Sequence, residues 1–153
     1  MDSSTEENGS DYQDTPVAWV RRAHLAIRRS LDESLAPYGL TAVQLDVLVN
    51  LWSKDGIEQR ELTVLMDMKG PTLTRVVDGL VTRGLVRRRE DKNDARVKRL
   101  FLTPSGKEME AKLSDESARF RSQLFKGFSE EDLDSLRKGL LRVAENVENI
   151  DRA

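Results

Sequence analysis

The cationic residues between positions 83 and 99 are those whose types and spacing could do chemistry. This segment holds eight Lys or Arg against three Asp or Glu, a net charge of +5, although the whole chain carries −2. Residues 1–14 carry −5 and residues 104–153 carry −2, so a basic middle lies between acidic ends. A local field of one sign attracts a polyanion, and the segment therefore favours contact with nucleic-acid phosphates.

A second group of polar residues precedes the basic segment, in the run Gly70-Pro71-Thr72-Leu73-Thr74-Arg75. Small side chains at a helix start allow close approach, and the unpaired N–H groups there favour phosphate. Thr72 and Thr74 could bond to a base edge or a phosphate, and Arg75 could reach guanine or a phosphate. The alternative for Arg75 is pairing with Asp67 or Asp78.

Asp94 and Arg96 form a third candidate feature. Arg96 follows a turn-prone stretch and could enter a narrow minor groove, while Asp94 two residues earlier lies on the same side of an extended strand and could aim it. Nearby cations are predicted to contact phosphates without reading sequence. These are Arg87, Arg88, Arg89, Lys98 and Arg99. The alternative is that such hairpin arginines are only solvated.

Helix, turn, helix and hairpin must position these residues. Predicted helices begin near Thr15, Thr41, Glu58, Pro71, Thr103 and Ser129, from capping residues and N-terminal prolines. Gly84 ends the helix from Pro71, and strands are expected at Leu85–Arg89 and Arg96–Leu102. In the short helix after Glu58, Leu62, Leu65 and Met66 are expected to face inward. The predicted fold is mainly α with a small β-hairpin wing: a winged helix-turn-helix plus a helical dimerisation region.

Other classes of function find little support in the composition. The chain has no cysteine and one histidine, His24, which excludes disulfides and Cys/His zinc sites. It offers no nucleophile–base pair and no phosphate loop, so we expect no enzyme, no cofactor and no metal. It lacks a membrane-length apolar run and a signal-peptide pattern, and the expected location is the cytoplasm.

The last predicted helix carries apolar residues at alternating gaps of three and four, a 3.5-residue repeat typical of helices that pack along a partner. These residues are Leu133, Leu136, Leu140, Val143, Val147 and Ile150. They could pair within the chain, but a dimer seam is favoured because no later segment covers a terminal helix.

These motifs together resemble the MarR family of transcription regulators, from about Val20 to the C-terminus. The resemblance is densest over Gln59-Arg60-Glu61-Leu62, Gly70 to Leu80, Arg83-Gly84-Leu85-Val86, Asp91-x-x-Asp94-x-Arg96 and Leu102-Thr103-x-x-Gly106. The Gly-Pro-Thr-Leu opening and Lys98-Arg99 look most like its SlyA-type branch.

The resemblance implies a homodimer whose two winged lobes address a pseudo-palindromic site in double-stranded DNA. It also implies that Arg96 is the minor-groove arginine and that Asp94 orients it. The chain departs from the family at Lys92, where proline is usual, and at Gln44, where the SlyA branch has a ligand-contacting histidine. Lys92 predicts a more flexible wing tip. Gln44 puts in doubt that this chain senses a ligand as the SlyA branch does.

Family members often respond to small aromatic acids, so a small aromatic or anionic effector is a further expected partner. The residues that could line its site are Trp19, Arg22, Arg28, Tyr38, Gln44 and Trp52. The alternative for each of them is ordinary packing or helix-surface charge, and it is favoured for any single residue.

The predicted organisation is an acidic disordered tail at 1–14, a helical dimerisation region at 15–40 and 104–153, and a winged helix-turn-helix at 41–103. The predicted DNA contacts are Pro71, Thr72, Thr74, Arg75, Arg88, Asp94, Arg96 and Lys98. A dimeric, sequence-specific DNA-binding regulator is the leading hypothesis. An architectural or protein-binding winged helix is the second, and an enzyme is a distant third.

Overall fold

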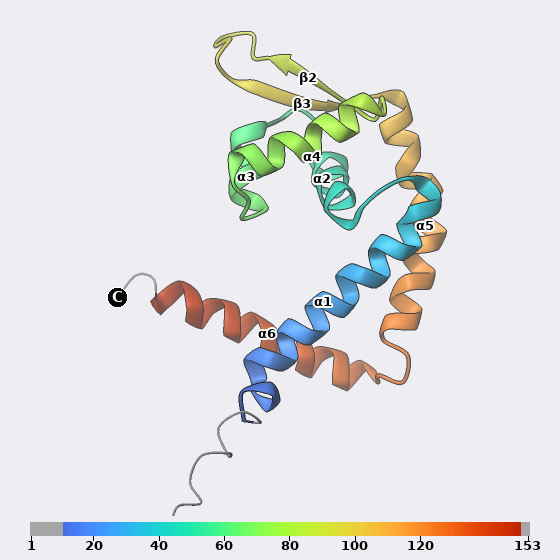
Figure 1. Ribbon diagram of the computed structural model, residues 1–153, viewed down its shortest axis with the longest axis vertical. Coiled ribbons are helices and arrows are strands. Elements are labelled where there is room, and N and C mark those ends of the chain that lie inside the picture. Colours follow the sequence, from blue (N-terminus) through green and yellow to red (C-terminus); the bar gives the residue numbers. More distant parts are fainter. Residues whose placement is uncertain (1–10, 151–153) are drawn as a thin grey trace, which may run out of the picture. The chain divides into compact units, whose positions relative to one another are not determined.

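Six α-helices, two short 3-10 helices and a three-stranded sheet make up the computed structural model, which describes residues 11–150 (Figure 1). The helices are η1 (Asp11–Asp14), α1 (Pro16–Leu35), η2 (Ala36–Tyr38), α2 (Ala42–Ser53), α3 (Gln59–Leu65), α4 (Gly70–Thr82), α5 (Pro104–Leu124) and α6 (Glu130–Ile150). The strands are β1 (Ile57–Glu58), β2 (Val86–Glu90) and β3 (Lys98–Leu102). The chain forms two compact units, Met1–Ala118 and Arg119–Ala153, and α5 spans their boundary.

The predicted helix starts are capped by side chains. The Thr15 hydroxyl accepts a hydrogen bond from the Ala18 amide, and Pro16 follows at the first helical position. Thr41 and Gln44 form the expected capping box, with both reciprocal hydrogen bonds present. A side-chain cap of this kind contributes about 1 kcal/mol by satisfying amides that have no partner in the helix.

The sheet has the order β1-β3-β2, and both pairings are antiparallel. Arg88 lies opposite Leu100 and Glu90 opposite Lys98 in the β2–β3 hairpin, which forms the wing. Ile57 pairs with Leu100 on the other side of β3. Strand β1 was not predicted, because two residues are too short to show the alternation that identifies a strand.

One hydrophobic core holds the first unit together. Leu48 and Leu51 of α2, Leu73 of α4 and Leu100 of β3 are all fully buried in it. Each such side chain stabilises the fold by about 1.5–3 kcal/mol relative to exposure. Leu35 of α1 and Leu113 of α5 belong to the same core cluster, so these helices pack directly on the winged lobe.

Several local predictions differ from the structure. Asp11–Asp14 is a 3-10 helix and not part of a disordered tail, and residues 1–10 of that predicted tail lie outside the described residues. The second wing strand begins at Lys98, not at Arg96. Leu65 is 60% exposed because only Leu62 and Met66 on that helix turn toward the core. The predicted division at 15–40, 41–103 and 104–153 stays a prediction.

Candidate nucleic-acid interface

The second helix of the helix-turn-helix, α4, presents a polar face opposite its buried one. Leu73, Val77 and Leu80 are fully buried, because they recur at helical spacing against the core. Pro71, Thr72 and Arg75 are exposed. Among the residues that the structure describes, Arg75 has no hydrogen-bond or ion-pair partner, so neither Asp67 nor Asp78 holds it.

The start of α4 lacks a side-chain cap. Its first residue is Gly70, one position before the predicted Pro71, and Lys69 at the N-cap makes no capping hydrogen bond. The first amides of the helix therefore have no partner within it, and the positive end of the helix dipole is added to them. Such an end favours an anionic oxygen.

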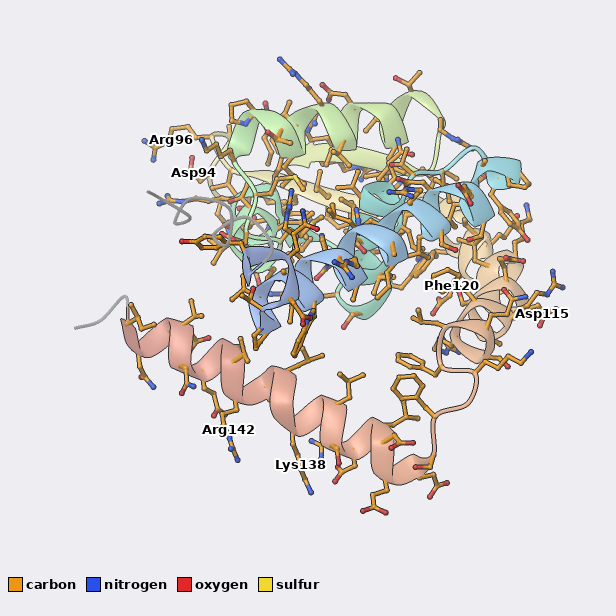
Figure 2. All side chains as sticks on the ribbon, turned by 60° about the horizontal axis from the view of Figure 1, so that its bottom comes forward. Asp94, Arg96, Asp115, Phe120, Lys138 and Arg142 are labelled. Carbon is orange, nitrogen blue, oxygen red and sulfur yellow. The ribbon has the colours of Figure 1, made fainter. Side chains whose placement is uncertain are left out.

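The wing tip holds Asp94 and Arg96 in a two-point ion pair. Arg96 Nε donates to Asp94 Oδ1 and Nη2 donates to Oδ2, both at 3.0 Å. The Arg96 side chain is nevertheless 91% exposed and projects at the end of the hairpin loop (Figure 2). The hydrogen bond from Arg96 holds the pKa of the Asp94 carboxyl below its ordinary value and raises the pKa of Arg96. Both groups are therefore charged at neutral pH.

A turn, not an extended strand, brings these two side chains together. The Arg96 backbone amide also donates to Asp94 Oδ1, at 3.0 Å, so the carboxylate closes a local turn of the type that aspartate favours. The expected pairing of Asp94 with Arg96 is present, but the expected strand geometry is wrong because residues 91–97 form no ladder.

Asp91 and Arg99 brace the base of this loop. Asp91 Oδ1 accepts the amides of Asn93 and Asp94, and Oδ2 accepts Arg99 Nε. Arg99 also donates to the Gly56 carbonyl at 3.0 Å and to Glu58 at 2.9 Å, which ties β3 to β1. The hydrogen bond from Arg99 is the main reason why the pKa of Asp91 is lowered.

This brace changes the expected role of Arg99 from a phosphate contact to a structural group. The role was not predicted, because the acids that hold Arg99 lie 41 and 8 residues away along the chain. Asp91 is the first residue of the Asp91-x-x-Asp94-x-Arg96 motif, and its place in that motif was the signal in the sequence that could have indicated this role. Lys92, which replaces the usual proline, is exposed within the loop that Asp91 closes.

Two other predicted phosphate contacts are engaged in the structure. Lys98 pairs with Glu90 across the hairpin at 2.6 Å, an exposed pair worth at most about 1 kcal/mol that an incoming anion can replace. Arg88 donates to Gln59 and to Asp78, both at 2.9 Å. Lys98 therefore remains available to a phosphate, whereas Arg88 is held between α3 and α4.

A cavity of about 570 Å³ separates the start of α4 from the wing tip. Its walls bring together residues of α3, α4 and the wing, among them Gln59, Thr74, Asp94, Arg96 and Lys98. Thr74 is only half-exposed there, because Gln59 Nε2 donates to its hydroxyl oxygen at 3.0 Å. Four predicted contact residues, from two separate motifs, thus share one hollow.

The six predicted effector residues have different partners in the structure, and their shared site stays a prediction. Trp19 donates to Asp14, Arg22 to the Gln13 carbonyl and Trp52 to the Gly106 carbonyl. Gln44 belongs to the capping box, and Tyr38 packs against the core. Arg28 lines a cavity.

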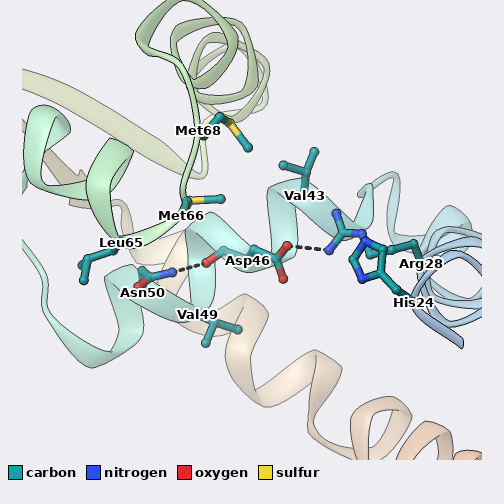
Figure 3. A pocket seen from close by; sticks show the side chains of 9 residues that line it. All are labelled: His24, Arg28, Val43, Asp46, Val49, Asn50, Leu65, Met66 and Met68. Atoms are coloured by element: carbon teal, nitrogen blue, oxygen red, sulfur yellow. Dashed lines mark hydrogen bonds and ion pairs between the residues drawn. The ribbon is translucent and has the colours of Figure 1, made fainter. Parts of the chain in front are cut away.

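That cavity lies between α1, α2 and the end of α3 and measures about 470 Å³ (Figure 3). Arg28 pairs there with Asp46 at 2.5 Å, beside His24. Met66 and Met68 form part of the opposite wall. His24 and Asp46 also line this cavity but were not among the predicted effector residues.

The apolar repeat of α6, in the second unit, lies largely open. Leu133 is half-buried, and the exposed fraction of the others rises from 39% at Leu136 to 72% at Ile150. Ser129 caps this helix as predicted, by accepting the Asp132 amide at 3.1 Å.

Metal-binding groups and membrane-length helices are both absent from the described part of the chain. Between residues 11 and 150, His, Asp and Glu side chains form no group of three that could hold a metal ion. No helix in that range is long and apolar enough to cross a membrane.

Comparison with known proteins places this geometry in a family. Residues 40–98 match the family model described as "MarR family". The uncharacterized HTH-type transcriptional regulator YwoH of Bacillus subtilis is 28% identical over 113 residues, which cover 74% of this chain and 82% of the relative. The regulator TtmR of Methylorubrum extorquens is 33% identical over 94 residues, 61% of this chain and 48% of its own.

Solved structures show the same arrangement. A MarR transcriptional regulator from Methanosarcina mazei superposes with a TM-score of 0.77 at 26% identity, over 86% of this chain and 95% of its own. A mutant MarR from E. coli, complexed with operator DNA, gives a TM-score of 0.73 at 26% identity, over 82% of this chain and 90% of its own. Sequence relatives, family model and fold agree: residues 40–98 match the MarR family, and the structure has the winged helix-turn-helix arrangement of solved MarR regulators.

Proposed function

We propose that the chain binds double-stranded DNA sequence-specifically as a homodimer, with α4 in the major groove and Arg96 in the minor groove. The observation that carries this proposal is that Arg96 donates two side-chain hydrogen bonds to Asp94 while its side chain stays 91% exposed. An arginine that is held in one orientation yet left in solvent loses little conformational entropy when it enters a groove. Narrow A·T-rich minor grooves attract such a group.

The exposed face of α4 supports major-groove reading. Arg75 has no partner among the described residues and can form two hydrogen bonds with guanine O6 and N7. Thr72 lies at the uncapped helix start, where its hydroxyl and the free amides can approach a base edge or a phosphate. The DNA complex of the similar E. coli MarR supports the same use of this fold.

The open face of α6 supports a homodimer. A helix that leaves six large apolar side chains between 39% and 72% exposed is unusual for a surface that meets only water. A second copy of α6 offers the same repeat and would cover it, as an isologous interface requires. Two winged lobes in one dimer would address two half-sites of a pseudo-palindrome.

A small anionic or aromatic effector fits the cavity between α1, α2 and α3. Arg28 supplies the cation, and Met66 and Met68 supply an apolar wall. A carboxylate ligand would compete with Asp46 for Arg28. Binding of salicylate to wild-type protein, and loss of that binding in Arg28→Met, is the expected result in a calorimetric titration.

An experiment on DNA binding separates this proposal from a winged helix that only clamps phosphate. Fluorescence titrations compare one selected operator with random duplex DNA at a fixed salt concentration. Arg96→Ala and Thr72→Ala should each lower affinity for the operator by about tenfold and change affinity for random DNA much less. Arg29→Ala, which removes an exposed cation from α1, is the charge-matched control and should leave the ratio unchanged.

Equal losses on the operator and on random DNA would contradict the proposal. They would favour the architectural alternative, in which the wing and helix contact only the backbone. The match of residues 40–98 to the MarR family model supports a DNA-binding regulator over an enzyme, because regulators of this family are non-enzymatic.

A further inference from the structure

Gln59, at the start of α3, joins the recognition helix to the wing. Its Nε2 donates to the Thr74 hydroxyl of α4 at 3.0 Å, and its Oε1 accepts from Arg88 Nε of β2 at 2.9 Å. Arg88 Nη2 also donates to Asp78 of α4 at 2.9 Å. These bonds link α3, α4 and β2 through the side chains of Gln59, Thr74, Arg88 and Asp78.

The chemistry of Arg88 decides which way the Gln59 amide points. A guanidinium carries only donors, so the atom of Gln59 that faces Arg88 must be the carbonyl oxygen. The Asp78 carboxylate, an acceptor only, holds the guanidinium from its other side. The amide nitrogen must then face Thr74, and this assignment does not depend on telling oxygen from nitrogen by position.

This orientation determines the polarity of the Thr74 hydroxyl. An N–H of Gln59 occupies one acceptor lone pair of Thr74 Oγ1, and Gln59 offers no acceptor there because its oxygen is engaged by Arg88. The proton of the Thr74 hydroxyl is consequently free to be donated. Thr74 lines the hollow between α4 and the wing tip, where a ligand atom could receive it.

We propose that Gln59 is a positioning residue that fixes the Thr74 hydroxyl as a hydrogen-bond donor, so that Thr74 selects bases with an acceptor at their major-groove edge. This inference rests on the proposed DNA-binding function. Guanine and thymine present acceptors there through O6, N7 and O4, and cytosine presents only an amino donor. Adenine presents both an acceptor, N7, and an amino donor. The hollow also contains Lys98, which can contact a phosphate. The neutral hydroxyl of Thr74 adds a contact that can distinguish between bases.

A nearly isosteric substitution tests the polarity. In Gln59→Glu the carboxylate still accepts from Arg88, but it can only accept from Thr74, so the hydroxyl must donate to Glu and turn its lone pairs outward. Duplexes are selected from a randomised library by the wild type and by the variant, and the bound pools are sequenced. At the position that Thr74 contacts, the preference should move from guanine or thymine toward cytosine, by about fivefold, while the preference for adenine, which carries both an acceptor and a donor, should change least.

Substitutions of Thr74 control for the added charge. Thr74→Val removes the hydroxyl with little change in shape, so in that background Gln59→Glu should lower affinity for all duplexes and alter no base preference. Thr74→Ser should retain the wild-type preference. Gln59→Leu, which removes both hydrogen bonds, should relax the preference at this position without inverting it, and thermal melts verify that each variant is folded.

The outcomes separate this inference from the function on which it rests. If the wild type selects no motif, the proposed function fails and the inference fails with it. If the wild type selects a motif and Thr74→Val lowers affinity equally for all duplexes, then Thr74 contacts phosphate and the inference alone is wrong. If Gln59→Glu keeps the wild-type base at every position, Gln59 does not set the polarity, and the inference is equally overturned.

Discussion

At the scale of residues, the two aspartates of the wing loop have different tasks. The Asp94 carboxylate accepts hydrogen bonds from the exposed Arg96 side chain. The Asp91 carboxylate instead closes the loop by accepting two backbone amides, and it also binds Arg99. A carboxylate in a basic wing would be unfavourable for DNA binding if it acted through charge alone. Its hydrogen bonds explain its presence, because each one restrains a cation or an amide that would otherwise sample many orientations.

These contacts predict how the brace depends on pH. The pKa of Asp91 in the folded protein lies below its ordinary value of 3.8. The carboxylate therefore contributes fully to stability above pH 3.8, and this contribution is lost as the pH falls through the lowered pKa of the folded state. The melting temperature of Asp91→Asn should therefore be lower than that of the wild type by a constant amount from about pH 5 to pH 8. Thermal melts across a pH series measure this difference.

As the pH falls through the lowered pKa that Asp91 has in the folded protein, the two proteins should converge, because the wild-type carboxyl becomes protonated. Asp115→Asn, at an exposed position on α5, is the matched control and should show no such pattern. A difference that vanished already near pH 6 would contradict the assignment of the brace to the Asp91 carboxylate.

At the scale of elements, the junction of the wing with α5 depends on a close backbone approach at Gly106. A Cβ placed there would lie 2.1 Å from the Leu85 carbonyl oxygen and 3.2 Å from Leu102 Cδ2. Because the nearest atom belongs to the backbone, it cannot move aside without disturbing the wing. The Gly106 carbonyl also accepts the Trp52 indole at 3.0 Å, so the same residue anchors α2.

Gly106→Ala should lower the free energy of unfolding by about 1–3 kcal/mol through overpacking. Chemical denaturation at neutral pH measures the change. Gly70→Ala is the control, since a Cβ there meets no heavy atom within 4 Å. Equal stability of Gly106→Ala and the wild type would show that α5 shifts freely against the wing.

The elements were predictable from sequence wherever the signal was local. The capping box at Thr41, the stop at Gly84 and the cap at Ser129 depend on neighbours within four residues, and all three occur. Strand β1 and the roles of Arg99 and Arg88 were missed, because the residues with which they pair are distant in the chain. Charge and spacing indicate that a residue is cationic but not which acid will hold it.

At the scale of the whole molecule, the proposed dimer depends on the apolar repeat of α6. Leu140→Asp with Val147→Asp introduces two charges into that face, where the native side chains are 45% and 51% exposed in one chain. Burying an unpaired carboxylate is strongly unfavourable, so the variant should be monomeric at micromolar concentration. Sedimentation velocity measures the change.

Loss of the dimer should also weaken binding to a two-half-site operator by at least about 100-fold, because the second lobe no longer binds intramolecularly. Arg142→Asp, on the other side of α6, is the control and should stay dimeric; Figure 2 shows where this side chain projects. A wild-type monomer that binds one half-site tightly would contradict the two-lobe proposal.

Sequencing of genomic fragments retained by the wild-type protein tests the central claim most directly, because the operator sequence emerges from the selection itself. The proposed dimer predicts one shared motif with two inverted half-sites, centred about 10 base pairs or a multiple of that apart. An A·T-rich stretch should flank each half-site where Arg96 enters the minor groove. Retained fragments that share no motif beyond general affinity for DNA would contradict the claim.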